Sequence, residues 1–184
     1  MDHDVDVWWA DLTAADVQLH QFLPEAERLR VSELSAAADR GRRLVAAALL
    51  QHAVHASRLA GRDAGSGHQG PVTVDRTCDE CGAQHGRPVV QGGPHLSVAH
   101  AGVLVVVATC STARVGVDVE RTDRLDAQAW VEHEARVKTA AHADAPVIAL
   151  QAPFDGYVAA LCVVPSDPIE ASAVVSVRTH RWAG

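Results

Sequence analysis

The stretch Val115-Gly116-Val117-Asp118-Val119-Glu120 shows most directly how this chain of 184 residues folds. Successive side chains of a β-strand point to opposite faces, so the three valines are predicted to enter the core while Asp118 and Glu120 share the other face. Two neighbouring carboxylates repel each other unless water or a cation neutralises them. The stretch therefore predicts either a solvated acidic strand end or a Mg²⁺ site, because Mg²⁺ favours one or two carboxylates together with phosphate oxygens.

Further strands are predicted on both sides of this stretch. Runs of apolar and β-branched residues are typical of strands, and polar, Gly- or Pro-containing turns separate the runs. A polar turn at Ser111 and Thr112 joins the central stretch to the strand before it. The predicted strands are Val5 to Trp9, Pro71 to Val74, Val103 to Thr109, Val115 to Val119, Val147 to Ala152, Tyr157 to Val164 and Ala171 to Val177.

Three helices are predicted between the strands. The first begins at Leu23-Pro24-Glu25 and continues to about Ala36, because Pro suits a first helical turn and an acid suits the positive end of the helix dipole. The second follows the cap residue Asp39 and repeats apolar residues at helical spacing as far as Leu59. The third runs from Asp126 to about Ala141.

The order of these elements predicts the fold class. Strand, helices, strands, helix and closing strands together indicate an α+β protein. The chain length allows two small halves that pack together. We expect the halves to be residues 1–111 and 112–184, similar to each other, each with a small, mostly antiparallel sheet and a long helix.

The composition excludes several classes of function. The chain carries 16 Lys and Arg against 23 Asp and Glu, a formal charge of -7, and 4% of its residues are aromatic. Binding along nucleic acid needs a basic face, so we expect no nucleic-acid partner. Apolar runs fall short of the roughly 18 residues of a membrane span, and the acidic N-terminus predicts no signal peptide. We therefore expect a cytoplasmic protein without a membrane partner.

The third predicted helix carries a candidate partner for the acidic strand. Trp130, Glu134 and Lys138 are spaced four residues apart and therefore line one helix face. By spacing alone, Glu134 and Lys138 could equally form a surface ion pair. His100, which precedes a buried strand, is by itself either a hydrogen-bonded structural residue or a ligand.

Two other groups of residues could bind a ligand. Arg40, Arg42 and Arg43 stand at the start of the second helix, where they oppose the helix dipole, so they are either solvated or bind an anion. Cys78, Cys81 and His85 have the spacing of zinc ligands, with His68 as a candidate fourth ligand. A tight turn with two packed thiols is the alternative.

Taken together, these segments resemble the phosphopantetheinyl transferase superfamily, in its longer, pseudo-dimeric type that modifies carrier proteins of polyketide and nonribosomal peptide synthesis. The matching segments occur in the family's order through most of the chain, and the GVDVE run and the HGRP turn are specific in combination. These segments are Leu23 to Arg28, Asp39 to Arg43, Cys78 to Gly82, His85 to Pro88, Ser97 to Gly102, Gly116 to Glu120 and Trp130 to Lys138.

The resemblance implies roles for the residues singled out above. Asp118, Glu120 and Glu134 would hold Mg²⁺ on the diphosphate of coenzyme A, and Asp118, Glu134 and Lys138 would be catalytic. The residues implied to face the phosphates of coenzyme A are Arg40, Arg43, Arg87 and His100. The implied reaction is attack of a serine hydroxyl of an acyl or peptidyl carrier protein on the β-phosphate, with release of adenosine 3′,5′-bisphosphate.

The chain also departs from the family pattern. Gln51, Ala99 and His133 stand where the family commonly has Arg, Ser and Lys. Residues 121–129 alone separate the acidic strand from Trp130, so the helical segment with which the family binds carrier proteins is missing. Three hypotheses follow: an active, compact transferase; a homologue repurposed for another reaction or for carrier binding; and a small interaction domain stabilised by zinc. A monomer and a homodimer both remain open.

Overall fold

A computed structural model gives the fold and describes residues 2–60, 70–165 and 173–184. The elements follow one another along the chain as strands interrupted by two helical regions. They are β1 (His3–Asp11), η1 (Leu12–Ala14), η2 (Val17–Phe22), α1 (Glu25–Ser32), α2 (Ala37–Ala60), β2 (His95–Ala101), β3 (Leu104–Cys110), β4 (Ala113–Arg121), α3 (Ala127–Thr139), β5 (Val147–Leu150), β6 (Tyr157–Pro165) and β7 (Val175–Arg181), where η marks a 3-10 helix.

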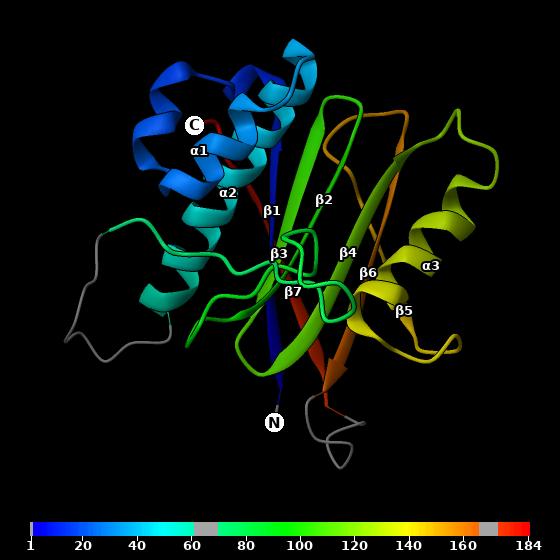
Figure 1. Ribbon diagram of the computed structural model, residues 1–184. Coiled ribbons are helices and arrows are strands. Elements are labelled where there is room, and N and C mark those ends of the chain that lie inside the picture. Colours follow the sequence, from blue (N-terminus) through cyan, green and yellow to red (C-terminus); the bar gives the residue numbers. More distant parts are fainter. Residues whose placement is uncertain (1, 61–69, 166–172) are drawn as a thin grey trace.

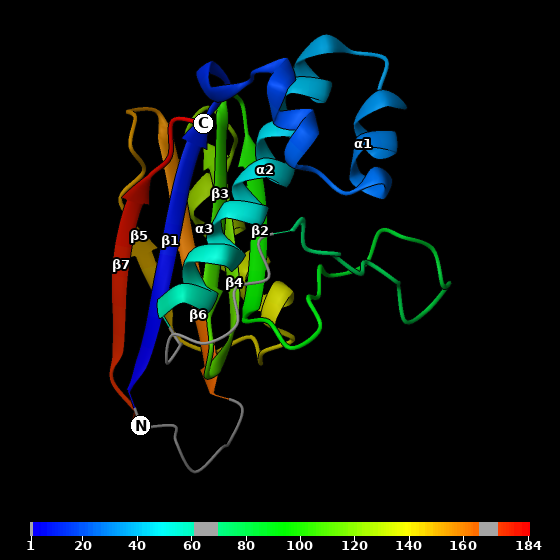
Figure 2. The ribbon, with the colours of Figure 1, turned by 90° about the vertical axis from the view of Figure 1, so that its left-hand side faces the viewer.

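The described strands form two sheets, which makes this an α+β protein as predicted (Figures 1 and 2). The first sheet has the order β2-β3-β1-β7, in which β3 pairs antiparallel with both β2 and β1 while β7 runs parallel to β1. The second sheet has the order β4-β6-β5 and is antiparallel. The chain passes from one sheet to the other at Ser111 and Thr112, between β3 and β4.

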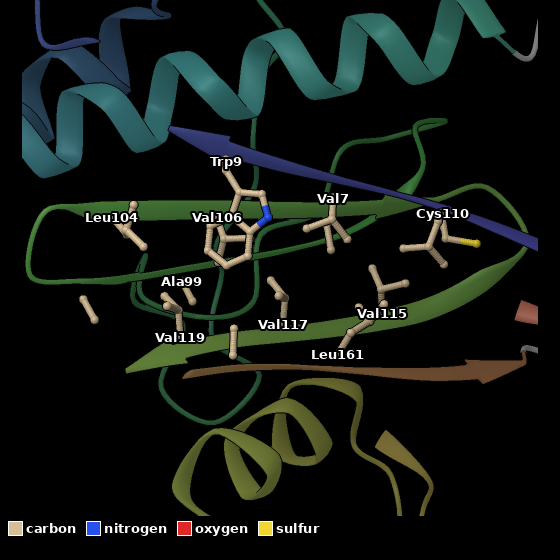
Figure 3. Packing of buried hydrophobic residues seen from close by; sticks show 14 of the residues in the cluster. Val7, Trp9, Ala99, Leu104, Val106, Cys110, Val115, Val117, Val119 and Leu161 are labelled. Carbon is tan, nitrogen blue, oxygen red and sulfur yellow. The ribbon is translucent and has the colours of Figure 1, made fainter. Parts of the chain in front are cut away.

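The two sheets face each other, and one helix covers the outer face of each (Figure 3). The core between the sheets is built from alternate residues of β1, β3, β4 and β6, with Trp9, Leu104 and Leu161 among its largest side chains. Helix α2 packs on the far side of β1 and β3, and α3 packs on the far side of β4 and β6. The resulting layers are helix, sheet, sheet and helix.

Strand β3 is apolar from Leu104 to Ala108 because both of its faces are buried. Leu104, Val106 and Ala108 enter the core between the sheets, whereas Val105 and Val107 contact the cluster around α2. A strand covered on both faces has no solvent-facing positions and therefore shows no alternation in its sequence. The continuous apolar run thus marks the centre of the first sheet.

Strand β4 confirms the alternation predicted from its sequence. Val115, Val117 and Val119 are buried between the sheets, as Figure 3 shows. The Oγ atom of Ser97 in β2 accepts a hydrogen bond of 3.0 Å from the backbone N–H of Val117. This buried bond links the adjoining edges of the two sheets, because β2 and β4 otherwise belong to different hydrogen-bond ladders.

Two local predictions were wrong. The segment Pro71 to Val74 forms no strand; instead the side-chain amide of Gln51 in α2 binds both backbone groups of Val72, at 2.7 and 2.6 Å. The backbone N–H and C=O groups of Val72 are thus paired with the Gln51 side chain and not with a neighbouring strand. Conversely, β2 was not predicted as a strand, although it pairs with β3 over its whole length.

The last strand differs in position from the sequence-based expectation. A strand was expected at Ala171 to Val177 within the second half, but residues 166–172 lie outside the described part of the chain and β7 begins at Val175. β7 pairs with β1 of the first sheet, and Val175 and Val177 pack against the core between the sheets. The chain therefore returns to its first sheet, and the first sheet contains a strand from beyond residue 112. No helix in the described residues is long and apolar enough to cross a membrane.

Candidate functional site

The contact between α3 and β4 is set by Gly116. A Cβ atom at this position would overlap the carbonyl oxygen of Ala135 and would lie 3.0 Å from Thr139 Cγ2 and 3.1 Å from Lys138 Cβ. A residue without a side chain therefore lets the helix come directly onto the strand. This close approach brings the last turn of α3 beside Asp118, two residues further along β4.

Lys138 binds Asp118 at this contact. Its Nζ atom donates to Asp118 Oδ1 at 2.7 Å and to the carbonyl oxygen of Val117 at 3.0 Å. Asp118 is 8% exposed, and burial raises the pKa of its carboxyl group. Lys138 opposes this rise in pKa, while the negative charges of Glu134 and Glu120 add to it.

Glu120 and Glu134 complete the acidic side of the site. Glu120 Oε1 accepts a hydrogen bond of 2.8 Å from the Arg121 N–H, and its Oε2 lies 3.8 Å from Arg124 Nη1. Arg124 in turn stacks on the Trp130 ring, 3.9 Å from the ring centroid. The predicted helix face of Trp130, Glu134 and Lys138 thus borders the acidic face of β4.

The three carboxylates offer the hard oxygen atoms that Mg²⁺ requires, but they do not surround a common point. Among the described residues, the group of three or more His, Cys, Asp or Glu side chains whose ligand atoms all lie within 4.8 Å of one another is Cys78, Cys81 and His85. Asp118 is instead neutralised by Lys138. Gathering Asp118, Glu120 and Glu134 around a metal would therefore require these side chains to move from their positions in this structure.

A pocket of about 660 Å³ opens beside this site. It lies between the loop before β2, strands β2 and β4, and the end of α3; Figure 1 shows this loop in front of β2 and β4. Four of its lining residues are cationic, and Asp79 is the one acid among the described lining residues. The four cations are Arg76, Arg87, Arg114 and Lys138. Such a concentration of positive charge in a protein of net charge -7 suits an anionic ligand.

Arg76 is held in place by a buried carboxylate. Its Nε atom lies 3.4 Å from Oε1 of Glu27, which also accepts a hydrogen bond of 2.8 Å from Arg30 Nη1. Glu27 is 3% exposed. Burial lowers the pKa of Arg76 and Glu27 opposes this, so the guanidinium, whose ordinary pKa is far above neutrality, keeps its charge.

Arg76 and Arg114 were not among the predicted site residues. Arg114 shares a face of β4 with Asp118 and Glu120, because it is four and six residues away from them, so the alternation of the strand was a signal that could have identified it. Arg76 depends on contacts between distant segments, and no local pattern marks it. Near these cations, the pKa of His95 is lowered by burial and then by Arg87 and Arg114.

His100 lies at the end of β2, close to the start of α2. The pKa of its ring is lowered by partial desolvation and then by the nearby cations Arg42 and Arg43. Lys138 contributes a smaller effect of the same sign. Arg43 therefore extends the positive region from the pocket towards α2, whereas the lowered pKa favours the neutral form of His100; Arg43 also acts on the pKa of Arg76.

Arg40 takes a different position from the other predicted phosphate-binding residues. Its guanidinium donates to the backbone carbonyl oxygens of Leu34 and Ser35, which close the connection between α1 and α2. It lines a separate pocket with His20 and Val31. The structure thus brings Arg87 and Lys138 into one pocket and Arg43 and His100 to its neighbourhood, whereas Arg40 caps a helix connection.

The turn that contains Cys78, Cys81 and His85 forms one wall of the cationic pocket. Cys81 Sγ lies 3.0 Å from His85 Nε2. Hydrogen bonds from the backbone N–H groups of Cys81 and Glu80 lower the pKa of the Cys78 thiol. His68, the candidate fourth zinc ligand, lies outside the described residues.

No protein-family model matches the chain, and no curated protein matches it either. The functional assignment therefore depends on the geometry and charge of the site described above.

Proposed function

We propose that this protein is a phosphopantetheinyl transferase-like enzyme that moves the phosphopantetheine arm from coenzyme A to a serine of an acyl or peptidyl carrier protein in the presence of Mg²⁺. The observation that carries the proposal is the cationic pocket beside Asp118. Arg87 and Lys138, which come from separate segments of the sequence, line this one pocket together with Arg76 and Arg114. A diphosphate with its negative charges is the type of ligand that four converging cations suit.

The residues of the site would act by position and charge. Arg76, Arg87 and Arg114 would bind phosphate oxygens of coenzyme A, while Lys138 would reach the phosphoryl group under attack. Asp118, Glu120 and Glu134 would hold Mg²⁺, which supplies further charge neutralisation when bound. Phosphoryl transfer depends mainly on alignment and on stabilisation of negative charge, so this set of side chains suits the reaction.

We also propose that the layered fold is a pseudo-dimer. One half would comprise β1, β2 and β3 with α2, and the other β4, β5 and β6 with α3. In each half a helix covers the outer face of an antiparallel sheet. The cationic pocket contains residues of both β2 and β4, so it lies where the proposed halves meet.

A repurposed homologue is the second candidate function. The ion pair of Asp118 with Lys138 occupies two residues that the transfer reaction would use, and residues 122–126 alone connect β4 to α3. Such a protein would bind coenzyme A or a carrier-tethered intermediate in natural-product biosynthesis without moving the phosphopantetheine arm.

Mass spectrometry of a carrier protein tests the transferase proposal. A carrier protein that lacks its arm is incubated with the full chain, coenzyme A and Mg²⁺. We expect the carrier to gain the mass of one phosphopantetheine arm. Glu120→Gln should lose at least about nine-tenths of the transfer rate, because the substitution removes one metal-binding carboxylate. Glu132→Gln should keep the wild-type transfer rate. Glu132 is a matched control because it lies on α3 and binds Gln128 on the helix surface.

Binding of adenosine 3′,5′-bisphosphate separates the two candidates. Binding that weakens in Arg87→Ala, without any mass gain on the carrier, would overturn the transferase proposal in favour of the repurposed homologue. If the protein neither binds adenosine 3′,5′-bisphosphate nor transfers the arm, both candidates are contradicted.

A further inference from the structure

We propose that Cys78, Cys81 and His85 bind one Zn²⁺ ion, with water as the fourth ligand. This site is separate from the proposed Mg²⁺ site and does not depend on the proposed transferase function. Two thiolates and one imidazole are the soft and borderline ligands that Zn²⁺ prefers over the hard oxygen ligands suited to Mg²⁺.

The ligand atoms are already close to one another. The two sulfur atoms and one ring nitrogen of His85 all lie within 4.8 Å of one another. In a tetrahedral zinc site, metal–sulfur bonds of about 2.3 Å and metal–nitrogen bonds of about 2.0 Å place neighbouring ligand atoms about 3.5 Å apart. The 3.0 Å separation of Cys81 Sγ and His85 Nε2 therefore needs only a small outward movement of the side chains.

The backbone of the turn is shaped around the Cys78 sulfur. Backbone hydrogen bonding from Cys81 and Glu80 lowers the pKa of the Cys78 thiol and so favours its thiolate form. Hydrogen bonds of this kind to a ligand sulfur orient a metal-binding thiolate and stabilise its negative charge. The turn is closed by hydrogen bonds of 2.8 Å from Gly82 N–H to the Cys78 carbonyl and from Cys78 N–H to the Ala83 carbonyl. Gly82 has φ +71°, which a glycine adopts without strain.

His85 is brought back to the cysteines by the residue that follows it. A Cβ atom on Gly86 would lie 2.7 Å from the carbonyl oxygen of Thr77 and 3.0 Å from Cys78 Cα, so only glycine fits here without displacing the backbone. The Gly86 N–H donates to the Arg76 carbonyl at 2.7 Å. The chain on both sides of the turn is joined by the pairing of Asp75 with Val89.

The site lies beside the cationic pocket, so a metal there would order the wall of that pocket. His85, Arg76 and Arg87 all line the cationic pocket. Outside the metal ligands, a hydrogen bond of 2.9 Å from Arg30 Nη2 to Gln84 Oε1 ties the turn to α1. A metal bound at the turn would therefore fix the segment that presents Arg76 and Arg87 to the pocket.

Metal analysis of the purified full chain tests the proposal. After expression in zinc-supplemented medium and removal of loose metal, we expect about one zinc ion per chain. Cys81→Ser and His85→Ala should each lower the zinc content at least about fivefold, because each removes one of three protein ligands. His142→Ala is the matched control, since His142 is exposed and lies outside the turn, and it should retain the wild-type zinc content.

A cobalt titration gives a measurement that does not depend on variant folding. Wild-type protein is stripped of metal by a chelator under reducing conditions and titrated with Co²⁺ alone. We expect the visible absorption of tetrahedral cobalt and a thiolate charge-transfer band, both reversed by added Zn²⁺. Absence of both bands, zinc content unchanged in His85→Ala, or a Cys78–Cys81 disulfide in protein purified under reducing conditions would each overturn the proposal.

Discussion

At the scale of single residues, Asp118 is the charged group on which the site depends most. It is buried on β4, with Glu120 and Glu134 nearby, so its negative charge is unfavourable without a partner. Lys138 provides that partner at 2.7 Å. Lys138 therefore offsets the cost of this buried negative charge, and a metal at Asp118 would have to share or replace the lysine contact.

Removal of Lys138 should destabilise the protein more than removal of both charges. We expect Lys138→Met to lower the free energy of unfolding by about 1–3 kcal/mol, because it leaves a buried carboxylate without its cation. The double variant Asp118→Asn with Lys138→Met should recover part of this loss. Urea denaturation at neutral pH measures both, and a double variant that is less stable than Lys138→Met would contradict the role assigned to the ion pair.

At the scale of elements, the seating of α3 on β4 decides where Lys138 lies. The helix buries Val131 and Ala135 against Ala160 and Cys162 of β6, so its apolar face is anchored on the sheet. Gly116 then sets the distance between helix and strand. Gly116 is therefore needed for the contact between Lys138 and Asp118, because any side chain at this position would move the last turn of α3 away from Asp118.

Gly116→Ala should disturb both stability and the ion pair. The added methyl group has no space, so we expect the free energy of unfolding to fall by about 1–3 kcal/mol. Thermal or urea denaturation measures the change. Gly70→Ala is the matched control: nothing lies within 4 Å of a Cβ atom built on Gly70, and this variant should unfold like the wild type. Equal stability of the two variants would show that α3 tolerates a shift away from β4.

At the scale of the whole molecule, several histidines share the same direction of pKa change. Burial lowers the pKa values of His52, His95 and His100, with further lowering by nearby positive charges. The unfolded chain therefore binds protons to these rings at a higher pH than the folded protein does. Their contribution to stability is present above the unfolded pKa of about 6.5 and is lost as the pH falls through the folded values.

We accordingly expect the protein to lose stability between about pH 7.5 and about pH 5.5, as measured by denaturation at a series of pH values. Replacement of His95 and His100 together by glutamine should flatten this dependence. Asp118 acts in the opposite direction, because its raised pKa makes the folded state bind a proton more readily as the pH falls. The measurement is therefore repeated in Asp118→Asn, where the loss of stability as the pH falls should be steeper. A stability that does not change with pH in that variant would contradict the role given to the histidines.

The fold class and most strands could be predicted from local sequence. Alternation in β4 correctly assigned three valines to the core and Asp118 to the opposite face, and the apolar periodicity of α2 identified the helix that covers the first sheet. The strand β2 was missed because His100, Ser97 and Ala99 give it no clear apolar alternation. The pairing of β7 with β1 could not be predicted, because partners in a sheet are chosen by contacts between residues about 170 positions apart.

For the candidate site, the sequence by itself determined which side chains are available: the acids of β4, Glu134 and Lys138 on one helix face, and the three possible metal ligands of the cysteine turn. Their spacing is local, and strand and helix geometry convert local spacing into a shared face. Tertiary structure alone decided that Lys138 binds Asp118, that Glu27 holds Arg76, that Gln51 binds Val72, and that Arg40 is removed from the pocket. The physical reason is that these contacts depend on how helices and sheets pack across the core, and packing distances such as that at Gly116 are set by side chains far apart in the chain.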